Sequence, residues 1–204
     1  MIRHSFFGAA LDGRAHREVR VSAAFAACFR ESHHFRQVVL GQLTESCVGA
    51  KRISDPAAWT CDTGVTVITG GRVDLVLRSE DRRAPAFRIE NKVEAPLSQA
   101  QVRRYRRDRD GSCLVALTKY PPRPTKEWLG DHGCHAVRWQ HMHRALTNTK
   151  PRNQVDRFLF TNFCSYIEEL GMAHREKQSL RAGYRLSPHF GRDQLVPEMT
   201  ETNG

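Results

Sequence analysis

The spacing of hydrophobic residues along the chain predicts helices at both ends and strands between them. Apolar side chains recur every three or four residues over 17–32 and again over 154–170, where Gly171 follows as a helix stop. Between these helices, 72–78 and 86–93 alternate apolar and polar residues, as half-buried strands do. The chain therefore reads as strands of a sheet framed by amphipathic helices.

Further elements complete an α/β pattern. Ser98 and Gln101 have the spacing of a capping box, which predicts a helix that ends at Gly111. Residues 113–118 are wholly apolar, as in a central buried strand. The remaining predicted elements are a helix over 34–44, a strand over 64–69, a short helix around Trp128 and a last strand over 134–139. The main order is α-β-β-β-α-β-β-α, which favours a mixed β-sheet flanked by helices.

The length of 204 residues fits one domain, predicted over 1–185, with a polar and loose C-terminal tail over 186–204. No apolar run approaches the roughly 18 residues of a membrane span. The N-terminus lacks the apolar core of a signal peptide. We therefore expect a cytoplasmic protein with no membrane partner.

The excess of basic residues adds a prediction about the partner of this protein. Lys and Arg number 32 against 22 Asp and Glu, a formal net charge of +10, and 26 of the 32 are Arg. Arginine binds phosphate in a bidentate manner, so this balance favours a polyanionic partner, with nucleic acid first. The alternative is codon usage in a GC-rich genome. Five arginines crowd the helix predicted after Ser98: Arg103, Arg104, Arg106, Arg107 and Arg109. We expect them to hold phosphates, unless they form a solvated face that Asp108 and Asp110 partly neutralise.

Cysteine and histidine give weaker signals. The six cysteines, at 28, 47, 61, 113, 134 and 164, form no CxxC pair and lie mostly in apolar stretches. This is typical of buried, reduced cysteines and not of a disulfide framework. His132, Cys134, His135, His141 and His143 gather in the sequence, but their spacing matches no zinc template, and whether they bind anything stays open.

Carboxylates and a lysine meet on the predicted hairpin of 72–78 and 86–93. If the loop closes symmetrically, Asp74 lies opposite Glu90, and alternation places Lys92 on the same face. Opposed like charges destabilise a sheet unless a cation lies between them. Either Lys92 or a divalent metal serves that purpose. Two carboxylates and a lysine suit Mg²⁺-dependent phosphodiester hydrolysis, whereas a solvated face with a Glu–Lys pair is the plain alternative.

These residues resemble the PD-(D/E)XK nuclease superfamily, whose fold is the restriction-endonuclease-like core. Asp74 followed by Glu90-Asn91-Lys92 on the next strand has that family's spacing, although Val73 stands where its motif has proline. Two other elements are similar: Gln101 and Tyr105 match a QxxxY element, and Glu18 on the first helix stands where many members place an acid. The region from Trp139 to NFCSYIEELGM (162–172) is similar to small stand-alone bacterial members.

The resemblance implies a role for each residue. Asp74 and Glu90 would bind the metal, helped by the Asn91 carbonyl, and Lys92 would orient the attacking water. Glu18 would hold the metal or a water in its outer shell. Gln101 and Tyr105 would contact the scissile phosphate. The alternatives are a capping role for Gln101, which we take to be incompatible with a site role for the same amide, and core packing for Tyr105.

The resulting hypothesis is a DNA nuclease that uses Mg²⁺, with Mn²⁺ as a substitute. The chain has no phosphate-binding G-x-x-x-x-G-K-[ST] motif, so no nucleotide cofactor is expected. The resemblance also implies phage defence or DNA processing, as a homodimer or within a larger complex. The alternatives are a catalytically inactive nucleic-acid-binding protein on the same fold and an RNA-binding or assembly subunit. Sequence preference and the mode of cleavage stay open.

Overall fold

Five strands form one mixed sheet in the order β1-β2-β3-β4-β5. The computed structural model describes residues 6–7, 16–47, 53, 55–66, 70–80, 87–107 and 111–173. The strands are β1 (Trp59–Thr66), β2 (Arg72–Ser79), β3 (Phe87–Lys92), β4 (Cys113–Thr118) and β5 (Cys134–Arg138). The first three strands are antiparallel, whereas β4 and β5 run parallel to β3. The predicted α/β class with a mixed sheet is therefore confirmed.

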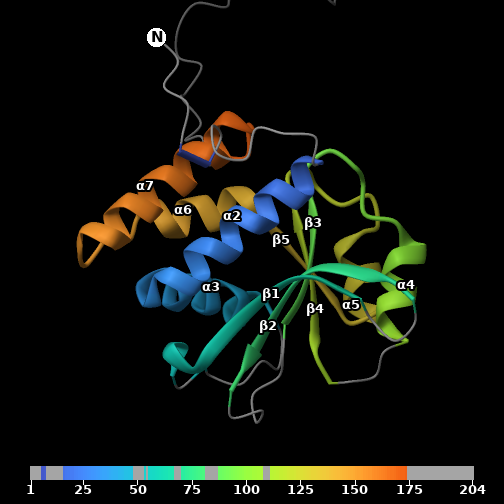
Figure 1. The fold of residues 1–204 in the computed structure, drawn as a ribbon. Coiled ribbons are helices and arrows are strands. Elements are labelled where there is room, and N and C mark those ends of the chain that lie inside the picture. The colour runs from blue at the N-terminus through green and yellow to red at the C-terminus, as the bar shows by residue number, and fades with distance from the viewer. Residues whose placement is uncertain are drawn as a thin grey trace, which may run out of the picture. The chain divides into compact units, whose positions relative to one another are not determined.

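Helices cover both faces of this sheet (Figure 1). The helices are α2 (Arg17–Glu31), α3 (His33–Ser46), α4 (Gln99–Arg106), α5 (Lys126–Asp131), α6 (Trp139–Thr147) and α7 (Gln154–Glu169), with a 3-10 turn η1 (Pro56–Ala58) before β1. In Figure 1, α2, α3, α6 and α7 lie on one side of the sheet, and α4 and α5 lie on the other.

An aromatic cluster forms the centre of the larger core. The Phe25 ring on α2 lies within 5.7–6.3 Å of the rings of Phe29, Phe35, Trp139 and Phe163, measured between centroids. Aromatic pairs at such distances add roughly 0.5–1.5 kcal/mol each beyond the burial of their area. Because these rings come from α2, α3, α6 and α7, the cluster joins all four helices of that layer.

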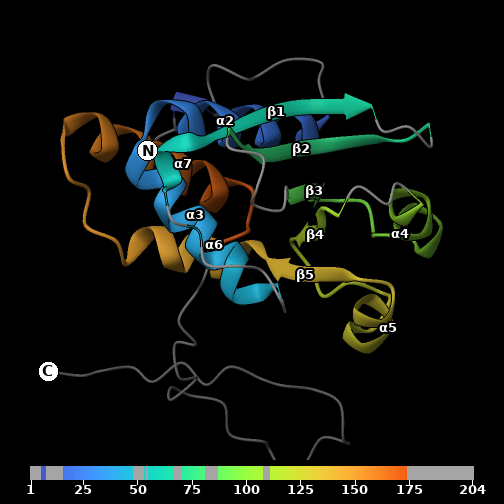
Figure 2. The ribbon, with the colours of Figure 1, turned by 90° about the horizontal axis from the view of Figure 1, so that it is seen from below.

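The smaller core holds α4 and α5 against the opposite face. Val102 and Tyr105 of α4 pack with Leu114 and Ala116 of β4 and with Leu129 of α5. Figure 2, turned by 90°, shows α4 and α5 on the side of the strands away from α2, α3, α6 and α7. Strand β4 is therefore covered on both faces, as its unbroken apolar sequence predicted.

Two element boundaries differ from the prediction, and one helix was not predicted. Strand β1 begins at Trp59, before the predicted 64–69, because Trp59 and Cys61 alternate inward with exposed Thr60 and Asp62. Helix α4 ends at Arg106 and not at Gly111. Helix α6 was not predicted at all. It follows β5 directly, without a side-chain cap at Arg138, so the sequence carries no start signal there.

All described residues belong to one compact unit, Met1–His174. The predicted domain end at residue 185 and the tail over 186–204 lie outside the described residues, so both stay predictions. Within the described part of the chain, none of the helices combines the length and the apolar character that crossing a membrane requires.

Candidate active site

The register between β2 and β3, continued by one residue, places Asp74 opposite Glu90. The ladder pairs Leu75 with Ile89 and Leu77 with Phe87, and Asp74 and Glu90 are the next residues beyond its end. This is the register that the symmetric loop predicted. The side chains of Ile89 and Phe87 belong to the larger core. By alternation, Glu90 points to the opposite face, where α4 packs.

Lys92 and Glu90 form a buried ion pair. The Lys92 Nζ lies 2.8 Å from Glu90 Oε1, and the two side chains are 12% and 6% exposed. Gln101 Nε2 donates a second hydrogen bond, of 3.2 Å, to the same Glu90 oxygen. The other oxygen, Oε2, is buried and has no hydrogen-bond partner among the described residues. The Tyr105 hydroxyl lies close enough to lower the pKa of Glu90, but it donates its hydrogen bond to the Arg72 carbonyl. A buried carboxylate oxygen without a direct hydrogen bond is costly, so Oε2 is a candidate position for a ligand.

The Asp74 carboxylate accepts a hydrogen bond from the backbone of β3. Its Oδ2 accepts the Asn91 N–H at 2.7 Å, across the hairpin. The Asn91 side chain points the other way and donates to Ser22 Oγ on α2 at 2.6 Å. Asn91 is fully buried, so this chain of contacts fixes β3 between α2 and Asp74. Ser22 lies on the apolar stripe of α2, and the sequence offered no other signal of its role.

The environment raises the pKa of both strand carboxyls. For Glu90, burial is the main cause and the nearby Asp74 adds to it, against the favourable charge of Lys92 and the Tyr105 hydroxyl. Burial also raises the pKa of Asp74, against the Asn91 N–H and the charge of Lys92, while Glu18 adds repulsion. The charge of Lys92 is therefore not enough to bring the pKa values of these two carboxyls back to their ordinary range. A bound cation would favour the ionised form of each carboxyl.

Glu18 lies beside the site and holds the chain that leaves β3. Its Oε1 accepts the N–H groups of Glu94 at 3.0 Å, Val93 at 3.3 Å and Ala95 at 3.4 Å. Burial alone would raise the pKa of Glu18, but these backbone donors outweigh it and keep the pKa below its usual value. Among the described residues, Glu18 does not form a three-carboxylate ligand group with Asp74 and Glu90. Its role toward a metal stays a prediction, and its direct role here is to anchor the turn after Lys92.

Gln101 fills two roles at once, although we expected these roles to be incompatible. Its Oε1 accepts the Ser98 N–H at 3.3 Å and completes the capping box. Its Nε2 reaches Glu90 Oε1 at the same time. The two ends of one amide are separate groups, an acceptor and a donor, so one side chain caps α4 and supports the carboxylate.

We expect substitutions of Gln101 to separate these two roles. Gln101→Glu keeps an oxygen for the Ser98 N–H but places a negative charge against Glu90, so it should impair the site more than the helix. Gln101→Ala loses both contacts and should lower the free energy of unfolding by roughly 0.5–2 kcal/mol, the range for a lost helix cap. Chemical denaturation and cleavage assays on both variants measure the two effects. Equal stability of Gln101→Ala and wild type would contradict the capping role.

Tyr105 packs in the core and also borders the site. Its side chain is buried in the smaller core, and its hydroxyl donates to the Arg72 carbonyl oxygen at 3.0 Å. Burial and the charge of Glu90 raise the pKa of Tyr105, so the phenol stays protonated. The two alternatives from the sequence, packing and site, are thus compatible. Contact with a scissile phosphate stays a prediction.

Four of the predicted arginines lie on α4 or at its C-terminal end and are exposed: Arg103, Arg104, Arg106 and Arg107. Arg109 lies outside the described residues. The Arg103 guanidinium lies 5.9 Å from the centre of the Trp128 ring on α5, a cation–π contact. The arginine-rich surface therefore stands on the helix that supplies Gln101 to Glu90.

A pocket of about 260 Å³ opens beside Lys92. It is lined by Lys92, Glu94, Ala95, Pro96, Leu97, Thr118, Tyr120, Pro121, Pro122 and Arg123. Tyr120 is 60% exposed, and Thr118 Oγ1 is buried without a hydrogen-bond partner among the described residues. Apart from Lys92, none of these residues was predicted as part of the site. The signal that could have found them is that β4 is parallel to β3, so the segment after Thr118 emerges at the same sheet edge as Lys92.

Asp74 and Glu90 are the residues that could hold a metal here. Mg²⁺ prefers carboxylate and carbonyl oxygens and retains several waters, so two carboxylates suffice. The unpartnered Glu90 Oε2 fits this donor set.

Comparisons of the chain with models of protein families, with curated proteins and with solved structures find no match in any of the three. The arrangement of Asp74, Glu90 and Lys92 therefore carries the functional argument.

Proposed function

We propose that the protein is a Mg²⁺-dependent phosphodiesterase that hydrolyses DNA, with Mn²⁺ able to replace Mg²⁺. The observation that carries this proposal is the buried Glu90, which has one oxygen on Lys92 and Gln101 and the other unpartnered, opposite Asp74. A plain Glu–Lys pair on a solvated face would leave both oxygens in contact with water. Here the carboxylate is buried.

The order of elements supports a restriction-endonuclease-like core as the finer description of the fold. Helix α2 precedes an antiparallel meander of three strands, and α4 then crosses over to the parallel strand β4. The acidic residues and Lys92 come from β2 and β3 of that meander, next to the crossover helix. This placement matches the one that the sequence resemblance implies.

Each side chain has a distinct part in the proposed reaction. Asp74 and Glu90 would hold the metal, and a metal bound there would lower the pKa of a coordinated water and neutralise phosphate charge. Lys92 places its amine beside these carboxylates, where it would orient the attacking water and stabilise negative charge that develops on the phosphate. Gln101 fixes the Glu90 carboxylate, and Glu18 fixes the turn that follows Lys92.

The surroundings of Lys92 suit a nucleic-acid strand. Tyr120 presents an exposed ring beside the pocket, and base stacking on such rings is tolerant of sequence. Arg123 lines the same pocket, and the arginines of α4 supply further phosphate contacts. Because these groups recognise backbone and ring surfaces, we expect weak sequence preference.

We expect the α4 arginines to set the salt dependence of DNA binding. The double variant Arg103→Ala and Arg107→Ala should bind DNA more weakly and reduce the slope of log affinity against log salt by about 2, or 1 per phosphate contact. Fluorescence anisotropy at several salt concentrations measures this slope. The matched control is Arg144→Ala with Arg157→Ala, because these exposed arginines lie on α6 and α7, on the other side of the sheet. Equal slopes for the two double variants would contradict the assigned surface.

The test of the proposed function is incubation of the purified chain with DNA, and separately with RNA, in Mg²⁺, Mn²⁺ or EDTA. Cleavage of DNA that needs the cation and is absent in Asp74→Ala supports the proposal. Cleavage of RNA alone would correct the substrate. Binding of DNA without cleavage under any condition would overturn the proposal and favour a catalytically inactive binding protein on the same fold.

A further inference from the structure

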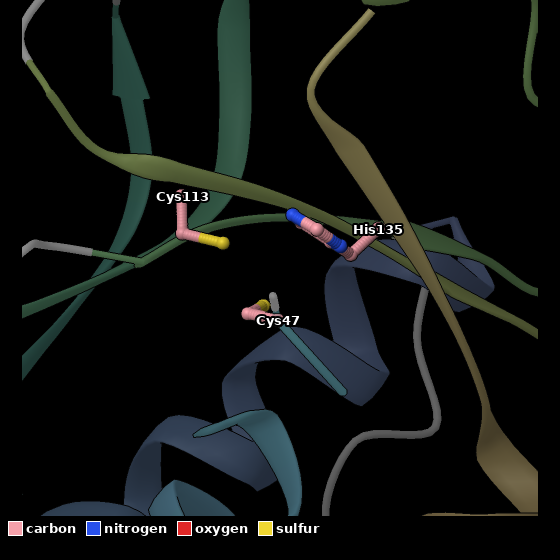
Figure 3. Close-up of side chains that lie close together, drawn as sticks. All are labelled: Cys47, Cys113 and His135. Carbon is pink, nitrogen blue, oxygen red and sulfur yellow. The ribbon is translucent and has the colours of Figure 1, made fainter. Parts of the chain in front are cut away.

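Three potential metal ligands meet at the end of β4 that lies away from Lys92 (Figure 3). Cys47 directly follows α3 as its C-cap residue, Cys113 begins β4 and His135 lies on β5. One ligand atom from each, the two Sγ atoms and an imidazole nitrogen, lie within 4.8 Å of one another. Of the residues from His132 to His143 that gather in the sequence, only His135 belongs to this group, which is why no sequence spacing predicted it.

The sheet register explains why these side chains converge. Val115 of β4 pairs with His135 of β5, and Cys113 lies two residues before Val115 on the same face. Val115 belongs to the larger core, so Cys113 and His135 also face the layer that contains α3. Cys134 points to the other face and packs in the smaller core. The neighbouring cysteine is therefore not a member of the group.

The local electrostatics favour the thiolate of Cys113 and the neutral imidazole of His135, whereas Cys47 stays a thiol until a cation binds. A hydrogen bond from the Cys47 thiol lowers the pKa of Cys113 despite partial burial, and the charge of Arg106 lowers it further. The same hydrogen bond, together with burial, raises the pKa of Cys47. Burial and Arg106 lower the pKa of His135, so its imidazole is neutral near pH 7, the form that binds metals.

We propose that Cys47, Cys113 and His135 form a Zn²⁺ site with three protein ligands and water in the fourth position. Thiolate and imidazole are the donors that zinc prefers, and Mg²⁺ avoids them. Cys113 and His135 are partly exposed, which leaves a route for the ion and room for a water. Zn–S and Zn–N bonds of about 2.3 and 2.0–2.1 Å place tetrahedral ligands roughly 3.5–3.8 Å apart, so the ligand atoms need to approach one another by about 1 Å at most.

The binding of Zn²⁺ to these three residues balances in charge and in protons. Both cysteines bind as thiolates and release their protons to solvent, and His135 binds as the neutral imidazole. The two negative sulfurs then cancel the charge of Zn²⁺, so the neighbouring Arg106 faces a neutral centre. Cys113 lies five residues before Thr118 on β4, roughly 16 Å along the strand, so the zinc centre and the carboxylate site at Lys92 are separate. The zinc centre would join α3 to β4 and β5 and stabilise the fold.

Titration of the reduced, full-length chain with Co²⁺, a spectroscopic substitute for zinc, tests this proposal. We expect a sulfur-to-cobalt charge-transfer band and the visible bands of tetrahedral Co²⁺, both removed by one equivalent of Zn²⁺. Zn²⁺ at about 100 times its Kd should raise the Tm by roughly 5–10 °C. Cys113→Ser and His135→Asn, at partly exposed positions, should lose the sulfur band or weaken zinc binding at least tenfold. Cys61→Ser is the matched control, since that thiol on β1 is outside the group, and it should retain both signals.

Two results would overturn the zinc site. One is the absence of Co²⁺ bands and of a zinc-dependent Tm shift in wild type. The other is a full signal in both Cys113→Ser and His135→Asn. Peptide mapping without reductant tests for a disulfide between Cys47 and Cys113. A disulfide found together with no zinc binding would assign this pair to redox chemistry and overturn the zinc site. Lys92→Ala should bind zinc like wild type, so failure of the nuclease proposal leaves this test unaffected.

Discussion

Lys92→Ala is expected to reduce Mg²⁺-dependent DNA cleavage by roughly 10²–10³-fold, the usual effect of removing one group that stabilises charge in a transition state. The Lys92 Nζ lies on the Glu90 carboxylate, in the position from which it would orient the attacking water. DNA affinity should change little, because the proposed binding surface lies on α4 and around Tyr120. Single-turnover cleavage and anisotropy on the same samples separate chemistry from binding.

The control for this substitution addresses both charge and folding. Lys126→Ala removes an equal charge from an exposed position on α5 and should cleave like wild type. Removing Lys92 also leaves Glu90 buried without its partner, which is costly. Lys92→Met retains the length of the side chain, and a thermal melt checks that each variant is folded. Wild-type cleavage by folded Lys92→Met would contradict the role of the amine.

Asp74→Asn is expected to make the metal-free protein more stable and inactive. The amide retains an oxygen for the Asn91 N–H but removes a carboxylate whose pKa is raised by burial and by repulsion from Glu18. The same carboxylate raises the pKa of Glu90, so its removal also relieves Glu90. Relief of such strain at active sites commonly stabilises proteins by roughly 0.5–2 kcal/mol at a cost in activity. Urea denaturation without divalent cations measures the gain. Lower stability than wild type at pH 7 would contradict the proposed charge repulsion.

The pH dependence of this gain provides a sharper test. The pKa of Asp74 is higher in the folded state than its ordinary value of about 4. Asp74 therefore contributes to the stability of the fold below about pH 4, and this contribution is lost as the pH rises through the pKa of the folded state. The amide that Asp74→Asn introduces does not titrate, so the advantage of the variant should grow between pH 4 and pH 7. Mg²⁺ should stabilise wild type, by about 2.7 kcal/mol at 100 times its Kd, and should leave the variant nearly unchanged.

Local patterns were sufficient to predict most of the sheet and the pairing of its carboxylates. Alternation over β2 and β3 fixed which side chains share a face, and the near-symmetric hairpin fixed the register that opposes Asp74 and Glu90. The capping box at Ser98 located the start of α4 correctly. These features depend on residues close together in the chain, which is why the sequence was informative about them.

Features that depend on packing between distant segments could not be predicted. Glu18 has the spacing of a stripe residue, and only the path of the chain after β3 gives it three backbone donors. The group of Cys47, Cys113 and His135 joins three elements that are distant in sequence. Helix α6 lacks a capping side chain, and its burial comes from contacts of Trp139 and Met142 in the larger core.

The measurement that tests the central claim most directly is a time course of DNA cleavage in Mg²⁺ by wild type and Glu90→Gln side by side, with EDTA as the blank. Glu90→Gln retains the shape of the side chain and an oxygen for Lys92 and Gln101 but removes the charge that would hold the metal. Cleavage by wild type, with none in EDTA and a loss of at least about 10²-fold in Glu90→Gln, is the predicted result. Equal cleavage by both proteins, or no cleavage by wild type, would contradict a metal-dependent hydrolytic site at Asp74, Glu90 and Lys92.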